Sequence, residues 1–272
     1  MRVAEALAAA RALGVGRLDA QLLLARRLQH DRAWLIAHAD HELDDAAEAA
    51  VRADFEQRAA GVPLVYLTGE REFYGLALTI TRDVLVPRPE TEGLVDWAIE
   101  LLRARVGQRA AVADLGTGSG AIALAVKARC PWVDMTATDL SAAALQVAQA
   151  NAARLGLVID FVEGAWYEPL CGRRFDLLLS NPPYIAGDDP HLAALVHEPR
   201  QALTAEGDGL ADLRALAAGA RQHLRQGGWL LVEHGHDQAD AVAALLREAG
   251  LLEVTLRRDL AGLPRISGAR VA

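Results

Sequence analysis

Short apolar segments with strand character alternate with longer helical segments from about residue 110 to the C-terminus. This alternation constrains the fold most, because parallel strands must be joined by crossovers and helices usually provide them. We therefore expect an α/β domain with a doubly wound parallel sheet. The expected strands lie within 111–120, 133–140, 159–164, 175–184, 227–235 and 252–260, and the expected helices within 121–130, 141–156, 208–226 and 237–249.

The first 63 residues have a different pattern and are expected to form a helical domain, 1–63. Leucines recur at helical spacing over 18–28, and acidic residues open a second helical pattern over 44–60. β-Branched and aromatic residues then alternate with polar ones between glycine turns, which predicts a β-hairpin linker over 64–90. The α/β domain is assigned to 91–272.

Three glycines, Gly116, Gly118 and Gly120, follow the first strand of this domain and precede its first helix. Such a loop lets a ligand approach the backbone at a helix N-terminus. Asp139 ends the next strand, where a carboxylate can accept hydrogen bonds from ribose hydroxyls. We expect an adenosine-containing ligand, and the loose dinucleotide fingerprint keeps a dehydrogenase open. Asp114, just before the loop, favours an ammonium or sulfonium over a pyrophosphate.

The fourth expected strand stops at Asn181-Pro182-Pro183-Tyr184. Two consecutive prolines fix φ twice and offer no backbone N–H, and Pro182 keeps Asn181 out of the helical region. Asn181 is thus held extended at the carboxyl end of a strand, where ligands of such sheets bind. The motif is either a strand terminator or a rigid holder of a ligand.

The composition narrows the class of protein. The net charge of −8 argues against a protein that binds DNA through a basic face. Cys130 and Cys171 lack metal-ligand spacing and are expected to be free thiols of a cytoplasmic protein. No apolar run approaches the roughly 20 residues that span a bilayer. We expect a monomer that contacts neither membranes nor nucleic acid.

The DLGTGSG loop (114–120), Asp139 and NPPY together resemble the class I S-adenosylmethionine-dependent methyltransferases, over 110–272. The resemblance implies a Rossmann-like core of seven strands, S-adenosyl-L-methionine as the cofactor and S-adenosyl-L-homocysteine as its product. It also implies that the loop lines the methionine part, that Asp139 binds the ribose and that Trp166 flanks the adenine. The implied cofactor-binding residues are Gly116, Thr117, Gly118, Ser119, Gly120, Asp139, Trp166 and Asn181.

Within these enzymes NPPY marks methylation of a planar amino or amide nitrogen, so Asn181 and Pro182 are the implied catalytic residues. The Asn181 side-chain oxygen and the Pro182 carbonyl can accept both N–H bonds of an –NH₂ group. This aligns the nitrogen with the methyl group and favours the positive charge that develops on it. Tyr184 can pack on the flat amide. The implied substrate-binding residues are Asn181, Pro182, Pro183 and Tyr184.

Longer segments resemble the release factor glutamine methyltransferases. They are 66–95, 180–192, 198–214 and 227–235, and with the helical region the resemblance spans almost the whole chain. It implies N5-methylation of the glutamine in the Gly-Gly-Gln motif of bacterial class I peptide chain release factors, which modulates translation termination. The N-terminal helices either grip the release factor or only cover one side of the core.

Other interpretations remain open at this point. The ribosomal-protein glutamine methyltransferases share NPPY but typically read PRSP where this chain has PRPETE (87–92), and an adenine-N6 DNA methyltransferase also uses NPPY. A non-catalytic binding module would hold the cofactor or a partner without turnover. PRPETE itself either closes over the cofactor or is a stiff linker.

Two further features bear on the site. The family often has an acidic residue before the tryptophan, and this chain has Ala165 there. Glu233, His234 and His236 suggest a metal site, but no further ligand with suitable spacing follows. We expect no metal and a structural or site-rim role for these three residues.

Overall fold

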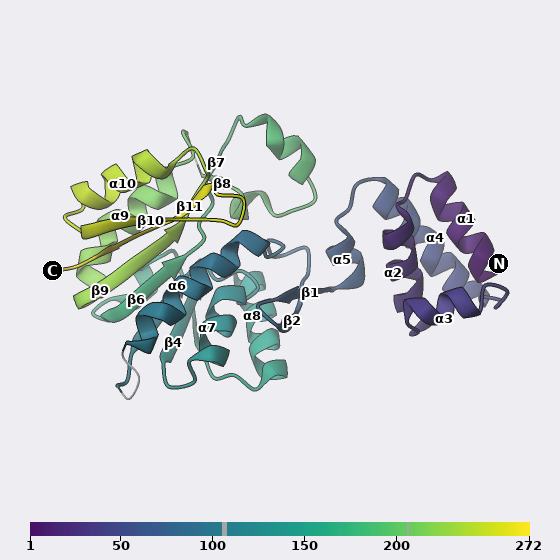
Figure 1. Ribbon diagram of the computed structural model, residues 1–272, viewed down its shortest axis with the longest axis horizontal. Coiled ribbons are helices and arrows are strands. Elements are labelled where there is room, and N and C mark those ends of the chain that lie inside the picture. The colour runs from purple at the N-terminus through teal and green to yellow at the C-terminus, as the bar shows by residue number, and fades with distance from the viewer. Residues whose placement is uncertain (105–107, 206) are drawn as a thin grey trace. The chain divides into compact units, whose positions relative to one another are not determined.

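The computed structural model describes residues 1–104, 108–205 and 207–272. The chain divides into two compact units, Met1–Glu70 and Arg71–Ala272. Figure 1 shows the helices of the first unit and the sheet of the second. In the described parts of the chain, no helix combines the length and apolar character needed to cross a bilayer. Cys130 and Cys171 are both free thiols, as predicted.

The first unit is helical, as expected, and buries an apolar cluster that includes Leu23, Leu35 and Phe55. A bidentate pair joins Arg27 to the buried carboxylate of Asp54, with contacts of 2.6 and 2.7 Å. Because that carboxylate is removed from water, its two charged hydrogen bonds offset the cost of burying it. The helices are α1 (Val3–Ala12), α2 (Arg17–Leu28), α3 (Arg32–Ala37), α4 (Asp45–Ala59) and α5 (Leu64–Thr68).

The short helix α5 corrects the expected start of the β-hairpin. Pro63 precedes its first turn and Gly69, with φ +75°, ends it in the left-handed region. Proline at a helix start and glycine after its end favour a helix over the strand that β-branched composition suggested. Leu67 then joins the apolar cluster of the helical unit. The helical unit therefore continues past residue 63.

The hairpin itself is shorter than predicted. It consists of β1 (Glu70–Phe73) and β2 (Leu76–Thr79). Tyr74 and Gly75, between them, both have positive φ, of 54° and 80°. Two left-handed residues make the tight turn that matches the twist of paired strands.

The second unit is built on a seven-stranded sheet, which confirms the predicted α/β fold. Its order is β10-β11-β9-β6-β3-β4-β5, with β11 antiparallel to both neighbours and the other pairs parallel. The sequence indicated six of these strands and left β11 unassigned. The strands are β3 (Ala111–Leu115), β4 (Asp134–Asp139), β5 (Asp160–Glu163), β6 (Phe175–Ser180), β9 (Leu224–Glu233), β10 (Leu252–Arg258) and β11 (Pro264–Arg270).

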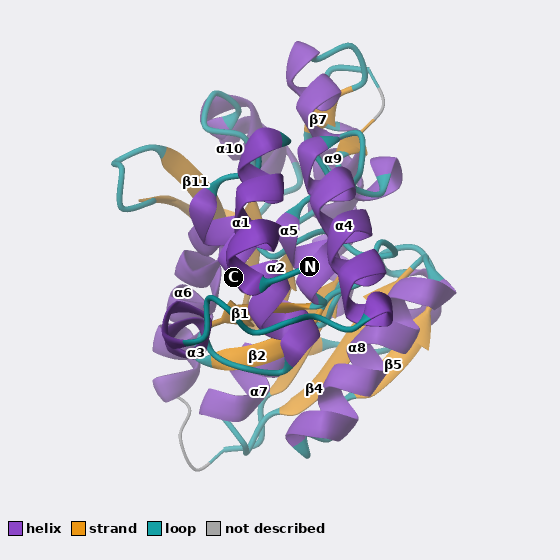
Figure 2. Cartoon of the chain, turned by 90° about the vertical axis from the view of Figure 1, so that its right-hand side faces the viewer, coloured by secondary structure: helices purple, strands orange, loops and turns teal. Residues whose placement is uncertain are grey.

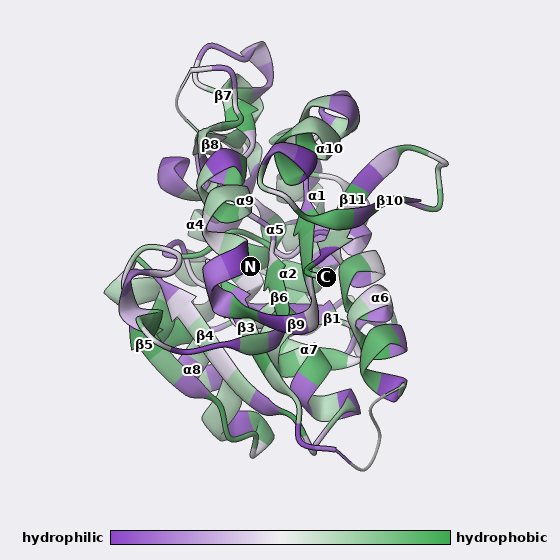
Figure 3. Cartoon of the chain, turned by 90° about the vertical axis from the view of Figure 1, so that its left-hand side faces the viewer, coloured by the Kyte–Doolittle hydropathy of each residue, from purple (hydrophilic) through white to green (hydrophobic). Residues whose placement is uncertain are grey.

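Helices cover both faces of this sheet (Figures 1 and 2). They are α6 (Glu92–Arg103), α7 (Ala121–Arg129), α8 (Ala142–Leu155), α9 (Ala211–His223) and α10 (Ala239–Glu248). The first three lie on one side and α9 and α10 on the other. Every residue of β6 is buried, and Figure 3 colours this strand as hydrophobic. Shorter elements are η1 (Pro89–Thr91), η2 (Glu168–Leu170), β7 (Ile185–Ala186), η3 (Pro190–Leu195), η4 (Arg200–Ala202) and β8 (Thr204–Ala205).

The strand order reverses between β3 and β6. From β3 the chain proceeds outward through β4 and β5, then returns to the other side of β3 to form β6. Asp114 pairs with Leu179, and the Ser180 hydroxyl donates a 2.7 Å hydrogen bond to the Leu115 carbonyl. The residues that follow the two strands therefore leave the sheet side by side, at the position where α/β sheets bind ligands.

One buried amide connects the hairpin to the loop after β3. Asn151 of α8 accepts a 2.7 Å hydrogen bond from the Thr79 amide and donates 3.0 Å bonds to the Thr79 and Ser119 carbonyls. Asn151 is fully buried. Its side chain thus acts as a strand neighbour for β2 and holds the glycine loop from behind.

We predict that Asn151→Ala destabilises the protein by about 2–4 kcal/mol, because it removes the partner of one buried and two half-buried backbone groups. Urea unfolding at 25 °C measures the change. Gln149→Ala is the matched control, since Gln149 is exposed on the same helix. Equal losses for the two variants would contradict the bracing role of Asn151.

Candidate active site

The glycine loop adopts a backbone that other residues strain to reach. Gly116, Gly118 and Gly120 have φ of +75°, +56° and +83°. A Cβ on Gly116 would lie 3.1 Å from the Trp166 ring, and one on Gly120 would lie 3.0 Å from Leu124. Glycine is therefore required here for conformation and for space. The loop leaves its backbone open to the cavity beside it.

Asp114 is placed beneath this loop. Its carboxylate is fully buried and accepts hydrogen bonds from the Thr117 hydroxyl (2.6 Å) and the Ala123 amide (3.2 Å). Its Oδ1 atom has no partner among the described residues. Burial raises the pKa of Asp114 to about 7, against the opposing effect of its two hydrogen bonds. Asp114 is not among the residues that line the cavity, so its carboxylate supports the loop from beneath.

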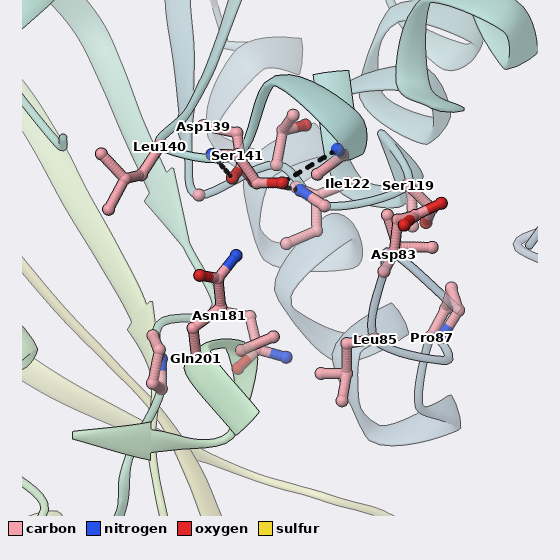
Figure 4. Close-up of a pocket in the computed structure, with 18 of the residues that line it drawn as sticks. Asp83, Leu85, Pro87, Ser119, Ile122, Asp139, Leu140, Ser141, Asn181 and Gln201 are labelled. Atoms are coloured by element: carbon pink, nitrogen blue, oxygen red, sulfur yellow. Dashed lines mark hydrogen bonds between the residues drawn. The ribbon is translucent and has the colours of Figure 1, made fainter. Parts of the chain in front are cut away.

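Asp139 lies at the end of β4 and lines the cavity. Its two oxygens accept hydrogen bonds from the amides of Gly118 (2.8 Å) and Ser141 (2.9 Å), drawn in Figure 4. Burial raises the pKa of this carboxyl group. Each carboxylate oxygen still has acceptor capacity, because an ionised carboxylate offers about four lone-pair sites. The backbone bonds hold Asp139 in place and leave it able to accept from hydroxyl groups.

Asn181 follows β6 and points into the same cavity (Figure 4). Its Nδ2 donates a 3.2 Å hydrogen bond to the Thr91 hydroxyl, so its Oδ1 remains available as an acceptor. Pro183 also lines the cavity, whereas Pro182 is buried. Tyr184 packs against the apolar cluster around α9 and α10 rather than lining the cavity.

Trp166 lines the cavity with a strained backbone. Its φ of +43° is rare for a bulky residue, and such outliers concentrate at functional sites. Its ring lies against Gly116. Asp212, at the start of α9, forms a hydrogen bond with Trp166 and also lines the cavity. No sequence pattern indicated Asp212, because acidic residues are common in the first turn of a helix.

The PRPETE segment forms one wall. Pro87, Arg88 and Thr91 line the cavity. Glu198 is 8% exposed and accepts a 3.2 Å hydrogen bond from the Val86 amide. Its carboxylate also forms an ion pair with Arg88, at 2.5 Å. A buried carboxylate thus fixes this segment to the chain that follows η3. No sequence pattern indicated this role for Glu198.

Glu233 and His234, at the end of β9, are buried, whereas His236 is exposed. His234 is fully buried between Ser267 (2.8 Å) and the Gly235 carbonyl (2.8 Å). No group of three or more His, Cys, Asp or Glu in the described residues is arranged to hold a metal ion. Glu233 is also buried, at 1% exposure.

The structure thus brings most of the predicted site residues to one cavity. Those that line it are Gly116, Thr117, Gly118, Ser119, Asp139, Trp166, Asn181 and Pro183, while Gly120, Pro182 and Tyr184 lie behind its surface. Ala165 also lines it and brings no side-chain hydrogen bond to that wall. A glycine loop, a carboxylate and an amide that face one space at the switch point match the site of a class I S-adenosylmethionine-dependent methyltransferase.

Solved structures share this fold at low sequence identity. The N-terminal domain of human METTL16 in complex with SAH is 17% identical, with a TM-score of 0.55, and the match covers 81% of this chain and 84% of that one. A methyltransferase from Pyrococcus furiosus is 17% identical, with a TM-score of 0.53, over 84% of this chain and all of that one.

Sequence relatives are much closer. The release factor glutamine methyltransferase of Bordetella pertussis is 54% identical over 94% of this chain and 95% of its own length. That of Xylella fastidiosa strain Temecula1 is 50% identical over 97% of each chain. The methyltransferase small domain family matches residues 91–211, and the PrmC N-terminal domain family matches residues 2–69. The chain belongs to the release factor glutamine methyltransferase family, and it is a methyltransferase.

The raised pKa of Asp114 predicts how stability depends on pH. Its pKa is about 7 in the folded protein and near 3.8 when unfolded, so the folded state binds the proton more tightly. The free energy of unfolding therefore falls as pH rises from about 4 to 7. Asp114→Asn removes the titrating group, so this variant does not lose stability in this way. Its free energy of unfolding, compared with that of the unmodified protein, should therefore improve as pH rises across that window.

Urea unfolding at pH 4.5 and 8 measures the difference. Asp208→Asn is the control, because Arg214 lowers the pKa of the exposed Asp208 to about 2. Asp208 is therefore ionised at both pH values, and the effect of its substitution on stability should be the same at both. A relative stability of Asp114→Asn that stays constant or falls with pH would show that the buried carboxylate does not titrate in this range.

Proposed function

We propose that this protein transfers a methyl group from S-adenosyl-L-methionine to the N5 amide nitrogen of the glutamine in the Gly-Gly-Gln motif of class I peptide chain release factors. One observation carries the proposal: Asn181, with its Oδ1 atom free, opens on the same cavity as the glycine loop and Asp139. The names of relatives that are about half identical over nearly the whole chain support the substrate.

The residues of the cavity fit the proposed cofactor. Gly116 and Gly118 present backbone that a Cβ would cover or strain, so a ligand can lie directly on it. Asp139 would accept from the ribose hydroxyls with the acceptor capacity that its backbone bonds leave free. Trp166 would flank the adenine. Asp212, beside Trp166, offers a carboxylate to this part of the site, where the family often has an acidic residue at the position of Ala165.

The bound cofactor supplies an electrophilic methyl group. An amide nitrogen is a poor nucleophile, so the protein contributes mainly by orientation. Asn181 Oδ1 and the Pro182 carbonyl accept both N–H bonds of the glutamine amide and hold the nitrogen toward the methyl group. Both oxygens carry partial negative charge, which favours the cationic nitrogen of the transition state. Tyr184 packs against the apolar cluster and supports the end of the NPPY motif from outside the cavity.

Other parts of the chain are assigned by the same proposal. The helical unit recognises the release factor, the hairpin links it to the catalytic domain, and PRPETE closes one side of the cofactor site. The enzyme works as a monomer in the cytoplasm and contacts no nucleic acid directly. The relatives named for release factors favour this substrate over ribosomal proteins and adenine in DNA.

We predict that Asn181→Ala and Asp139→Ala affect different steps, the first turnover and the second cofactor binding. Asn181→Ala lowers kcat by about 100-fold or more, because it removes an acceptor that aligns the substrate, while S-adenosylhomocysteine binding is largely kept. Asp139→Ala weakens that binding about 10-fold or more. Isothermal titration calorimetry and single-turnover kinetics separate the two effects. Near-normal turnover of Asn181→Ala, or unchanged affinity of Asp139→Ala, would contradict the corresponding role.

Mass spectrometry tests the function itself. A purified release factor is incubated with the protein and S-adenosyl-L-methionine, with ribosomal protein and duplex DNA as parallel substrates. A single methyl group is expected on the glutamine of Gly-Gly-Gln. Methylation of ribosomal protein or adenine instead would retain the role of NPPY and overturn the proposed substrate.

A further inference from the structure

Glu233 is a buried carboxylate that the proposed mechanism does not use. It is the last residue of β9 and only 1% of it is exposed. Its Oε2 atom has no hydrogen-bond partner among the described residues. Burying a carboxylate with an unsatisfied oxygen costs stability. A buried carboxylate at the end of a central strand therefore suggests a functional role that offsets this cost in stability.

The sheet places Glu233 beside the NPPY motif. Strand β9 is parallel to β6, and Ser180 pairs with Val232. Asn181 and Glu233 are the next residues along the two strands, so they leave the sheet as neighbours. The side chains of Thr91 and Asn181 lie near the Glu233 carboxylate, and hydrogen bonding to each of them lowers its pKa. Asn181 also donates to the Thr91 hydroxyl, at 3.2 Å. Three polar side chains from three segments thus form one network.

The direction of this network follows from its chemistry. An ionised carboxylate accepts hydrogen bonds and cannot donate them. Thr91 must then direct its single O–H toward Glu233, and its oxygen accepts from Asn181. The Asn181 amide must present its NH₂ group to this side, which turns Oδ1 to the other. Without the carboxylate, the amide could flip, because its N and O atoms are nearly equal in shape.

Several charged and titratable groups lie near Glu233. Burial raises the pKa of Glu233 to about 7, whereas Thr91, Arg265 and Asn181 lower it and Glu90 raises it. The phenol of Tyr184 is also near: burial, and after it the charge of Glu233, raises the pKa of Tyr184 to about 12. The carboxylate therefore changes its charge close to neutral pH.

We propose that Glu233 is a positioning residue that acts through Thr91 to orient the Asn181 amide, so that two acceptors, and never a donor, face the substrate nitrogen. This inference rests on the proposed methyl transfer to a glutamine amide. An –NH₂ group has two donors, and a flipped Asn181 would oppose one of them with its own NH₂. The network thus sets the site for a primary amide, and Glu233 acts from outside the cavity wall that Thr91 and Asn181 help to form.

Glu233→Gln tests the role without changing the shape of the side chain. Since Gln also carries a donor, it no longer dictates the direction of the network. We expect kcat for a purified release factor to fall about 10- to 100-fold, with KM for S-adenosyl-L-methionine within about 2-fold of the unmodified protein. Thr91→Val should cause a similar fall, and Thr91→Ser, which keeps the hydroxyl group, should restore most of it.

The pH profile gives a readout that a merely structural role would not change. For the unmodified protein, kcat at saturating substrates should rise as pH increases through about 7, because ionised Glu233 is the acceptor that fixes Asn181. Glu233→Gln should lose this rise. Ser267→Ala is the structural control: it breaks the neighbouring buried bond to His234 and should keep the rise.

The outcomes are distinguishable. Turnover of Glu233→Gln within about 3-fold of the unmodified protein, with the same pH profile, would overturn the inference and leave the proposed function intact. A fall in kcat matched by an equal loss of S-adenosylhomocysteine affinity would also overturn it, since it would indicate general damage. If the unmodified protein transfers no methyl group to the release factor, the proposed function fails, and this inference fails with it.

Discussion

The pairing of β3 with β6 is the interaction on which the site depends. These strands are separated by about 60 residues of chain, yet Asp114 and Leu179 lie in register and Ser180 bonds to the carbonyl of Leu115. Because both strands are parallel, their carboxyl ends meet at one edge of the sheet. The glycine loop and NPPY, which are far apart in the chain, consequently become neighbours in space. A one-residue slip would turn Asn181 to the opposite face.

Buried carboxylates support this arrangement from behind. Asp114 holds the glycine loop through Thr117 and Ala123, Glu198 holds the PRPETE segment through Arg88, and Glu233 stands behind Asn181. Each costs stability, because burial opposes the charged form. In return, each fixes a segment that has little regular structure of its own. The site is thereby organised before a ligand arrives, which is the condition for catalysis by orientation.

Sequence patterns predicted some elements well and others poorly. The alternation after residue 110 predicted the strands and helices of the core, because each has a distinct hydrophobic period. It failed at Leu64–Thr68, where capping by Pro63 and Gly69 outweighed strand propensity. It also missed β11, since Pro264 and Gly268 make a weak strand pattern that only pairing with β9 and β10 stabilises. Asn151, Glu198 and Asp212 had no distinctive pattern around them.

By itself, the sequence determined what its local chemistry requires: glycines where φ must be positive, prolines that hold Asn181 extended, and an α/β order of elements. Only the tertiary structure decided which of these segments are neighbours. Strand order, and therefore the placement of Asn181 between the glycine loop and Glu233, depends on contacts between residues far apart in the chain. Local propensity carries no information on such contacts, because they are fixed by packing and pairing in the complete sheet.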